Sequence, residues 1–337
     1  MNSFSPYGVD LFGQPITAES ASPVAQKFIV PPFSVLNTRD VDWQNRKRAW
    51  ASIGIRGEIG RDAEAYGCGS SGDMSKSMRT EVRDRSSMDP MPESSKEDYQ
   101  RIVLDSNFGS GVKGGVSIFD PVLCELIYRW FSAPGQQIVD PFAGGSVRGI
   151  VASCLGRKYW GCDLRQEQID ANREQGAELC KGDNMPEWVC GCSREKLVAA
   201  PMADLVFSCP PYGDLEEYSQ DPLDLSCMAH GAFVESYRAI IAQAVARLRP
   251  DRFACFVVGD FRDSKGFYRN FVSETIRAFE DAGAMLYNEA ILVTSVGSAC
   301  MRVTRQFEAG RKFAKTHQNI LVFCKGNWRK ATRELTI

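Results

Sequence analysis

The sequence predicts an α/β fold in which helices cover both faces of a sheet. From about residue 117 onward, short apolar runs alternate with amphipathic stretches, as strands and helices do in such folds. In the segment 138–149 an apolar run leads into a glycine-containing turn and then a helix, so that backbone N–H groups can approach a ligand closely. Asp163 ends the next strand-like run, and an acid about 20 residues beyond such a turn holds ribose hydroxyls in doubly wound sheets. Together these features predict a nucleoside-containing cofactor.

The individual elements are predicted from their local sequence. Pro121 suits the first turn of a helix over 122–131, which Ala133-Pro134-Gly135 ends. The other strands are expected at 137–142, 159–163, 203–208, 252–259, 286–294 and 318–324, and the other helices at 146–156, 166–179, 233–248 and 268–282. No helix is expected between the last two strands, so these two should pair antiparallel.

The N-terminal third differs in composition from the rest of the chain. Residues 1 to about 25 are rich in Ser, Pro and Gly, and residues 60–100 are polar with several turn-forming clusters. These compositions are typical of a loose tail and a long loop. We therefore expect a partly irregular N-terminal extension, residues 1–114, followed by one α/β domain, residues 115–337.

Composition and charge restrict the class of protein. A hydrophobic content of 44% and a charged content of 24% are typical of soluble globular proteins. The net charge is −2, so any contact with nucleic acid must come from a local basic patch. No apolar run approaches the roughly 20 residues of a membrane span, and residues 1–6 lack the features of a secretory signal. We expect a cytoplasmic protein without a membrane partner.

The twelve cysteines are scattered along the chain, and several lie in apolar runs where thiols pack as small hydrophobes. Cys180, Cys190 and Cys192 form a cluster of a type that binds zinc, with His230 and His317 as possible further ligands. The cluster lacks paired Cys-x-x-Cys spacing, which favours reduced thiols and no metal.

A second constellation is the apolar run 204–208, which ends in a rigid turn, Cys209-Pro210-Pro211-Tyr212. Open α/β sheets bind ligands at the carboxyl ends of their strands, so this turn and the glycine turn should face one crevice. The alternatives are that the glycine turn is only a tight connection and that the second turn is a stiff loop with Tyr212 packed on the core.

These motifs resemble those of S-adenosylmethionine-dependent DNA amino-methyltransferases, which act on adenine N6 or cytosine N4. Asp140 to Gly145 resembles the cofactor motif and Cys209 to Tyr212 the catalytic motif of these enzymes. The helical segment 119–131 and the last strand, 318–326, extend the match over roughly residues 115–326, and methylases of phages and prophages are especially similar. The resemblance implies a Rossmann-like, mostly parallel sheet with an antiparallel C-terminal strand. It also implies S-adenosylmethionine as cofactor and DNA as partner. The DNA would be a duplex with one base flipped out.

The resemblance also implies which residues form the site. For catalysis these are Ser208, Cys209, Pro210, Pro211 and Tyr212. For cofactor binding they are Phe119, Asp120, Asp140, Pro141, Phe142, Gly144, Gly145, Asp163 and Asp183. Asp163 has an alternative interpretation as an exposed strand end, and Asp183 as part of a simple turn. Asp214, Glu216, Glu217 and Tyr218 would form either a loop over the target base or a solvated acidic loop.

The chemistry of such a reaction suits these residue types. An exocyclic amine is a poor nucleophile because its lone pair is delocalised into the ring, and acceptors that bind its N–H hydrogens localise that pair. Two prolines fix the turn and offer no N–H that competes for the carbonyls. Tyr212 can stack on a base taken out of the duplex.

The sequence departs from the family pattern at two positions. Cys209 stands where Asp, Asn or Ser is usual, and sulfur is a weak acceptor, so Ser208, Asp214 or the Pro210 carbonyl would have to contribute more. Because Cys is closest in shape to Ser, cytosine N4 is slightly favoured over adenine N6. Alternatively, Cys209 is a covalent nucleophile for methylation of cytosine C5. Ser146 replaces a usual glycine of the cofactor motif.

Two groups of basic residues are candidates for DNA contact. Arg302, Arg305, Arg311, Lys312 and Lys315 are expected at a hairpin tip between the last two strands, where they would bind phosphates, unless they form only a charged surface loop. The run 46–48, flanked by Trp43 and Trp50, is either a second DNA surface or a solvated helix face with two core tryptophans.

Other function classes remain open at this point. Cys209 also fits a methyltransferase-like fold that has lost catalysis and only binds nucleic acid or a partner. A third hypothesis keeps the chemistry and replaces DNA by RNA or protein.

Overall fold

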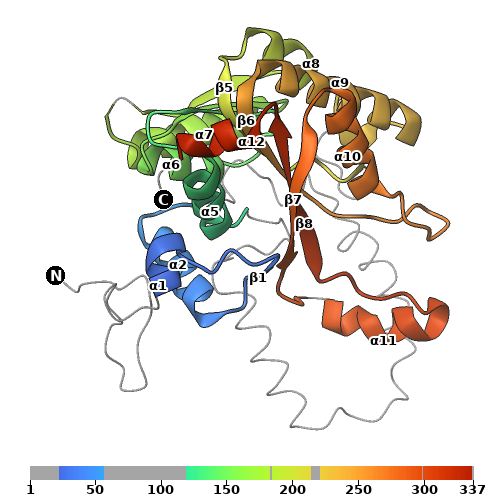
Figure 1. Ribbon diagram of the computed structural model, residues 1–337. Coiled ribbons are helices and arrows are strands. Elements are labelled where there is room, and N and C mark those ends of the chain that lie inside the picture. Colours follow the sequence, from blue (N-terminus) through green and yellow to red (C-terminus); the bar gives the residue numbers. More distant parts are fainter. Residues whose placement is uncertain (1–22, 57–118, 183, 214–220, 298, 336–337) are drawn as a thin grey trace, which may run out of the picture.

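The computed structural model describes residues 23–56, 119–182, 184–213, 221–297 and 299–335 (Figure 1). These residues form an eight-stranded sheet in the order β1-β7-β8-β6-β5-β2-β3-β4. The strands are β1 (Val35–Asn37), β2 (Gln137–Asp140), β3 (Lys158–Asp163), β4 (Glu187–Cys190), β5 (Ala203–Ser208), β6 (Leu248–Val258), β7 (Met285–Val293) and β8 (His317–Lys325). Neighbours pair in parallel except for β8, which is antiparallel to both β6 and β7. The predicted α/β class, with a mostly parallel sheet and an antiparallel C-terminal strand, is confirmed.

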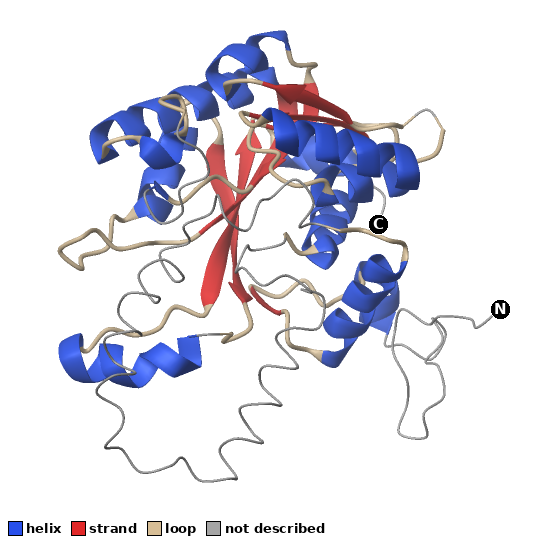
Figure 2. Cartoon of the chain, turned by 180° about the vertical axis from the view of Figure 1, so that it is seen from behind, coloured by secondary structure: helices blue, strands red, loops and turns tan. Residues whose placement is uncertain are grey.

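Helices cover both faces of the sheet (Figure 2). They are α1 (Pro23–Phe28), α2 (Val41–Ser52), α5 (Pro121–Phe131), α6 (Val147–Cys154), α7 (Gln166–Leu179), α8 (Ser193–Lys196), α9 (His230–Arg247), α10 (Phe271–Asp281), α11 (Ala299–Gly310) and α12 (Trp328–Arg333). One face of the sheet packs with α2, α5, α6 and α7, and the other with α9 and α10.

The alternation of side chains along the central strands produces these two cores. In β5, Leu205 and Phe207 lie in the first core and Val206 in the second. In β6, Cys255 lies in the first core and Phe256 in the second. Strands that are covered on both faces are apolar throughout, which is why they were visible in the sequence as continuous apolar runs.

Most predicted elements are present with shifted ends, and two differences are substantive. The antiparallel pairing of the last two strands is confirmed, but the expectation of no helix between them is wrong because α11 occupies 299–310. From Arg302 to Gly310 this helix is exposed, and the basic residues in and after it favour a charged surface loop when the sequence is taken alone. The short strand β4 was not predicted, since four residues carry little periodicity.

The N-terminal extension is less irregular than expected. Its residues 35–37 form the edge strand β1, which pairs in parallel with β7, and helix α2 packs on α5. Residues 1–22 and 57–118 lie outside the described residues, so the boundary near residue 114 stays a prediction. In the described parts of the chain, no helix is both long and apolar enough to cross a membrane.

A buried carboxylate fastens α2 to α5. Glu125 of α5 is 1% exposed and accepts hydrogen bonds from Arg46 (2.6 and 2.5 Å), Arg129 (2.9 Å) and the Trp50 indole (2.8 Å). Arg46 is therefore part of an internal ion pair and does not form a DNA surface with its neighbours. Trp43 is a core residue, as the alternative interpretation of this segment had it.

Replacing Glu125 by Gln should lower the free energy of unfolding by about 3 kcal/mol at pH 7, because it leaves the Arg46 charge without its partner. Burial alone would raise the pKa of Glu125, but the hydrogen bonds and charge of Arg46 outweigh it, and the pKa lies below its ordinary 4.5. The stabilisation is thus present above about pH 4.5 and is lost as the pH falls through the lowered, folded-state pKa. Urea unfolding at several pH values should show the difference between wild type and Glu125→Gln shrinking below that pH. The exposed Glu178, which pairs with Arg56, is the control, and Glu178→Gln should change stability by less than about 1 kcal/mol.

Candidate active site

A cavity of about 390 Å³ opens at the carboxyl ends of the central strands. Ligands bind at this place in open α/β sheets. Besides Arg148, Gln318 and other side chains, four groups of residues line it. They are the turn after β2 (Pro141, Phe142, Gly144, Gly145), the end of β3 (Cys162, Asp163, Leu164, Arg165), the turn after β5 (Cys209, Pro210, Pro211, Tyr212), and the start of α5 with two N-terminal residues (Phe119, Asp120, Leu123, Thr38, Lys47). The two motif turns therefore share one cavity, as the sequence predicted.

The turn after β2 is built on the buried carboxylate of Asp140. Asp140 is fully buried and accepts hydrogen bonds from Arg148 Nε (2.5 Å), Tyr159 OH (2.7 Å) and Ser208 Oγ (2.5 Å). The Phe142 backbone N–H donates to the same carboxylate at 3.1 Å. One acid thus joins β2, β3, β5 and α6 directly beneath the cavity.

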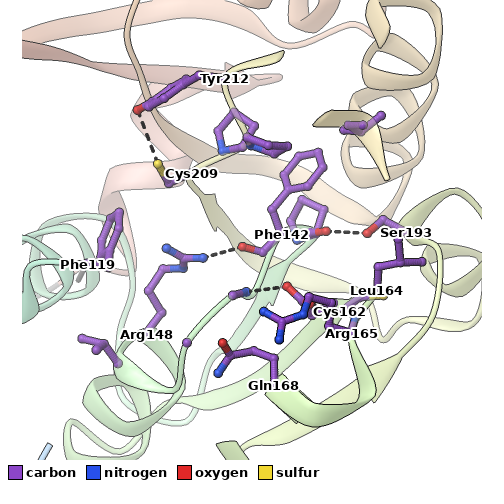
Figure 3. A pocket seen from close by; sticks show the side chains of 18 of the residues that line it. Phe119, Phe142, Arg148, Cys162, Leu164, Arg165, Gln168, Ser193, Cys209 and Tyr212 are labelled. Carbon is purple, nitrogen blue, oxygen red and sulfur yellow. Dashed lines mark hydrogen bonds between the residues drawn. The ribbon is translucent and has the colours of Figure 1, made fainter. Parts of the chain in front are cut away.

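Arg148 links the buried Asp140 to the wall of the cavity. Its guanidinium donates to the carbonyl oxygens of Phe142 and Ala143, and it lies over the Phe119 ring at 4.5 Å (Figure 3). Burial opposes its charge, but the nearby Asp140 carboxylate outweighs burial and raises the pKa of Arg148. Arg148 therefore stays charged and holds the backbone of the turn in place.

Asp140 and Ser208 are placed differently from the sequence-based interpretation. Neither lines the cavity, and the Ser208 hydroxyl is buried and donates to Asp140. From this position Asp140 and Ser208 support the two turns. The roles expected from the sequence, Asp140 in cofactor binding and Ser208 in catalysis, would therefore be exerted through the two turns that they hold.

The glycine turn leaves room for a ligand, and Asp163 faces it. Gly144 has φ +51°, a left-handed conformation that favours glycine. Its N–H donates to Asp163 Oδ2 at 3.0 Å, and the Arg165 N–H donates to Asp163 Oδ1 at 3.0 Å. Asp163 also lines the cavity, where carboxylate oxygens act as hydrogen-bond acceptors for a ligand. Asp163 is thus a cavity residue and not an exposed strand end.

Ser146, the departure from the cofactor motif, does not narrow the cavity. It is buried, and its hydroxyl donates to Gln175 of α7 at 2.6 Å. Ser146 therefore ties the start of α6 to α7. Glycine at this position would lack that contact.

The turn after β5 presents Tyr212 to the cavity (Figure 3). Gln318 of β8 donates to the Tyr212 hydroxyl at 2.6 Å, and Cys209 Sγ lies 3.6 Å from the same oxygen. Gly213 follows with φ +56°, and a Cβ there would lie 2.7 Å from the Phe261 ring. The turn is therefore fixed from both sides, while Tyr212 is only partly packed on the core.

Several lining residues were not predicted as site residues. From the sequence alone, Lys47 is a candidate only for DNA contact, and Gln318 is only part of a predicted strand. Arg148 had a signal in the sequence, since it is a single charge within the otherwise apolar stretch 147–154. A charge buried at such a position requires a partner, and Asp140 is the nearest acid before it.

Some predicted residues cannot be placed. Asp183 and the segment with Asp214, Glu216, Glu217 and Tyr218 lie outside the described residues. Among the described residues, no group of three His, Cys, Asp or Glu side chains is arranged to hold a metal ion.

The predicted DNA-contact residues do not form a hairpin tip. Arg302 and Arg305 lie on helix α11, and Arg311, Lys312 and Lys315 follow it. This helix lies beyond the ends of β7 and β8, at the edge of the sheet that also carries the cavity (Figure 1). Burial lowers the pKa of Lys315, against the opposing effect of Asp260.

No family model matches the sequence, and no curated protein matches it. Solved structures match in fold. TrmN from Thermus thermophilus has 17% identity and a TM-score of 0.41, and the match spans 61% of this chain and 49% of TrmN. Magnesium protoporphyrin IX methyltransferase (ChlM) from Synechocystis PCC 6803, solved with bound SAM, has 13% identity and a TM-score of 0.40 over 75% of this chain and 94% of ChlM. A TehB-like SAM-dependent methyltransferase from Corynebacterium glutamicum has 16% identity and a TM-score of 0.39 over 69% of this chain and 97% of its own. At such low identities and scores the similarity concerns the fold alone.

Replacing Asp140 by Asn should lower the free energy of unfolding by about 3 kcal/mol or more, because it leaves the buried Arg148 charge without its partner. Asp163→Asn is the matched control, since Asp163 lines the cavity and is bound by two backbone N–H groups. It should cost about 1 kcal/mol. Urea denaturation without added ligand measures both values, and equal effects of the two variants would refute the supporting role of Asp140.

Proposed function

We propose that this protein transfers a methyl group from S-adenosylmethionine to an exocyclic amino group of a DNA base, with cytosine N4 slightly favoured over adenine N6. The observation that carries the proposal is that the glycine turn after β2 and the Cys209–Tyr212 turn after β5 line one cavity. A donor held at the first turn and an acceptor at the second would then meet. The resemblance of both turns to DNA amino-methyltransferase motifs supports this pairing.

The lining residues fit the cofactor. Asp163 offers carboxylate oxygens to ribose hydroxyls, and Gly144 and Gly145 allow the backbone to approach closely. Phe119 lies on the opposite side of the cavity from Leu164 and Arg165 in Figure 3, so an extended ligand is contacted at both ends. When bound, S-adenosylmethionine supplies a methyl group on a positively charged sulfur.

The turn after β5 suits the amine acceptor. Cys209 and Pro210 line the cavity, and the Cys209 sulfur and the Pro210 carbonyl would accept from the N–H hydrogens of the amine and so localise its lone pair. Methyl transfer would form a bond between the amine nitrogen and the methyl carbon and break the carbon–sulfur bond, so that S-adenosylhomocysteine leaves and the nitrogen releases one proton to water. Tyr212, whose hydroxyl is fixed by Gln318, would stack on the flipped base.

The basic surface near α11 supports DNA as the partner. We define the α11 surface as the exposed and half-buried segments 262–269 and 302–315, which together hold eight Lys and Arg residues and two acids, although the whole chain has a net charge of −2. The two segments are neighbours, since Lys312 lies next to Gly266. Phe267 and Phe313 are 72% and 77% exposed. Positive charge with exposed aromatic rings suits phosphates and unstacked bases.

Expression of the protein in cells that lack their own DNA methylation should yield N4-methylcytosine or N6-methyladenine by nucleoside mass spectrometry. Tyr212→Ala should reduce methylation at least 100-fold, because the stacking ring is lost, while Tyr212→Phe should retain most of it. Tyr212→Ala should still bind cofactor. If purified wild type binds cofactor and labels no DNA, or if it labels RNA or protein in preference, the proposal is wrong.

Cys209→Ser separates amino-group chemistry from a covalent mechanism. Serine oxygen is the better acceptor, so amino-group methylation should be retained or increased. With a covalent cysteine mechanism, wild type would instead give 5-methylcytosine and Cys209→Ser would lose all activity. Cys154→Ser, at an exposed cysteine of α6, is the control and should change nothing.

Neutralising the α11 surface should weaken DNA binding without preventing cofactor binding. In the double variant Arg311→Asn and Lys312→Gln, asparagine suits the left-handed backbone of residue 311 (φ +52°). The slope of log K against log salt should become shallower by about 2, because up to two phosphate contacts are lost. The double variant Arg329→Gln and Arg333→Gln, on the exposed α12, should leave the slope unchanged. An unaltered slope in the first variant would mean that this surface does not contact DNA. The proposed methyl transfer would not be affected by that result.

A further inference from the structure

An ion pair lies at one end of the cavity, between Lys47, which belongs to none of the motifs, and Asp120 just before α5. Lys47 Nζ of α2 is 3.3 Å from Asp120 Oδ2, and both residues line the cavity together with Thr38 and Phe119. Phe119 marks this end, which in Figure 3 is opposite Leu164 and Arg165 and so opposite the neighbouring Asp163. The two ends therefore offer different chemistry to a ligand that spans the cavity.

The Asp120 carboxylate is held in one orientation. Oδ1 accepts from the Val122 N–H at 2.9 Å and so caps α5, while Oδ2 accepts from the Trp43 indole at 3.2 Å. Asp120 is mostly buried, with a side chain 14% exposed, whereas the Lys47 side chain is 40% exposed. The pair thus consists of a fixed anion and a cation that can reach toward the cavity.

Lys47 is placed there by the docking of α2. The neighbouring Arg46 pairs with the buried Glu125, and Trp43 is buried against α5. These contacts fix the helix on which Lys47 stands. The position of the lysine is thus set by buried interactions of residues that precede it on the same helix.

We propose that Lys47 and Asp120 together bind the amino-acid end of the cofactor, Lys47 its carboxylate and Asp120 its ammonium group. An α-amino acid carries both charges on one carbon, and a lysine–aspartate pair at 3.3 Å presents the complementary charges at matching spacing. Arg148, the other cation near this end, already donates to Asp140 and to the carbonyls of Phe142 and Ala143. The inference rests on the proposed function because it assumes that cofactor.

The N-terminal segment then completes the cofactor site. Thr38 and Lys47 are contributed by residues far from the motifs in sequence. A chain that begins near residue 115 would lack both. The segment thus has a role in cofactor affinity.

The test compares two ligands that differ in the amino-acid end. S-adenosylhomocysteine carries the amino acid, and 5′-methylthioadenosine has only a methyl group in its place. In calorimetric titrations of the full chain, Lys47→Met should weaken S-adenosylhomocysteine binding about tenfold, because one charged hydrogen bond is lost. Binding of 5′-methylthioadenosine should change less than twofold. Arg39→Met, at an exposed arginine just before α2, is the control and should change neither.

Further variants make the result independent of folding effects. Lys47→Arg keeps the charge and should retain most of the affinity, and added salt should weaken S-adenosylhomocysteine binding to wild type more than to Lys47→Met. Equal losses for the two ligands would mean that Lys47 only supports the fold, and no loss would mean that it does not contact the ligand. Either result overturns the inference and leaves the proposed function standing. If wild type binds neither ligand, both the inference and the proposed function are wrong.

Discussion

The pairing of Asp140 with Arg148 is the interaction on which the rest of the site depends. A carboxylate that is fully buried is costly unless every charge and hydrogen bond around it is satisfied. Here donors from β3, β5, α6 and the turn itself meet on one group. The strand ends that carry the glycine turn and the Cys209 turn are therefore held at a fixed separation before any ligand arrives. Such preorganisation is what the alignment of a donor and an acceptor requires.

The sequence was sufficient to predict the sheet and the place of the cavity. Strands such as β5 and β6 are apolar on both faces, and the turns that follow them contain glycine and proline in recognisable order. The convergence of Phe142 and Tyr212 in one cavity followed from the rule that parallel strands bring their carboxyl ends together.

What the sequence could not give was the distribution of roles among polar residues. Asp140 and Asp163 both end strands, yet one is buried under four donors and the other faces the cavity. The difference arises from where Arg148 and Tyr159 come to lie, and that depends on packing between elements distant in sequence. Lys47 is a comparable case, because its place in the cavity depends on the burial of Glu125. Helix α11 was not predicted because the basic residues in and after it are as typical of a surface loop as of an exposed helix.

The edge of the sheet has a consequence for how the chain is made. Strand β1 pairs with β7, and the Thr38 hydroxyl donates to Val293 O at 2.9 Å across 255 residues of sequence. During synthesis from the N-terminus, this first strand remains without its neighbour until nearly the whole polypeptide has left the ribosome. Closing so long a loop has a large entropic cost, and contacts over such a long sequence separation slow folding. Truncated translation products should consequently lack a complete ligand cavity, which ties activity to full-length synthesis.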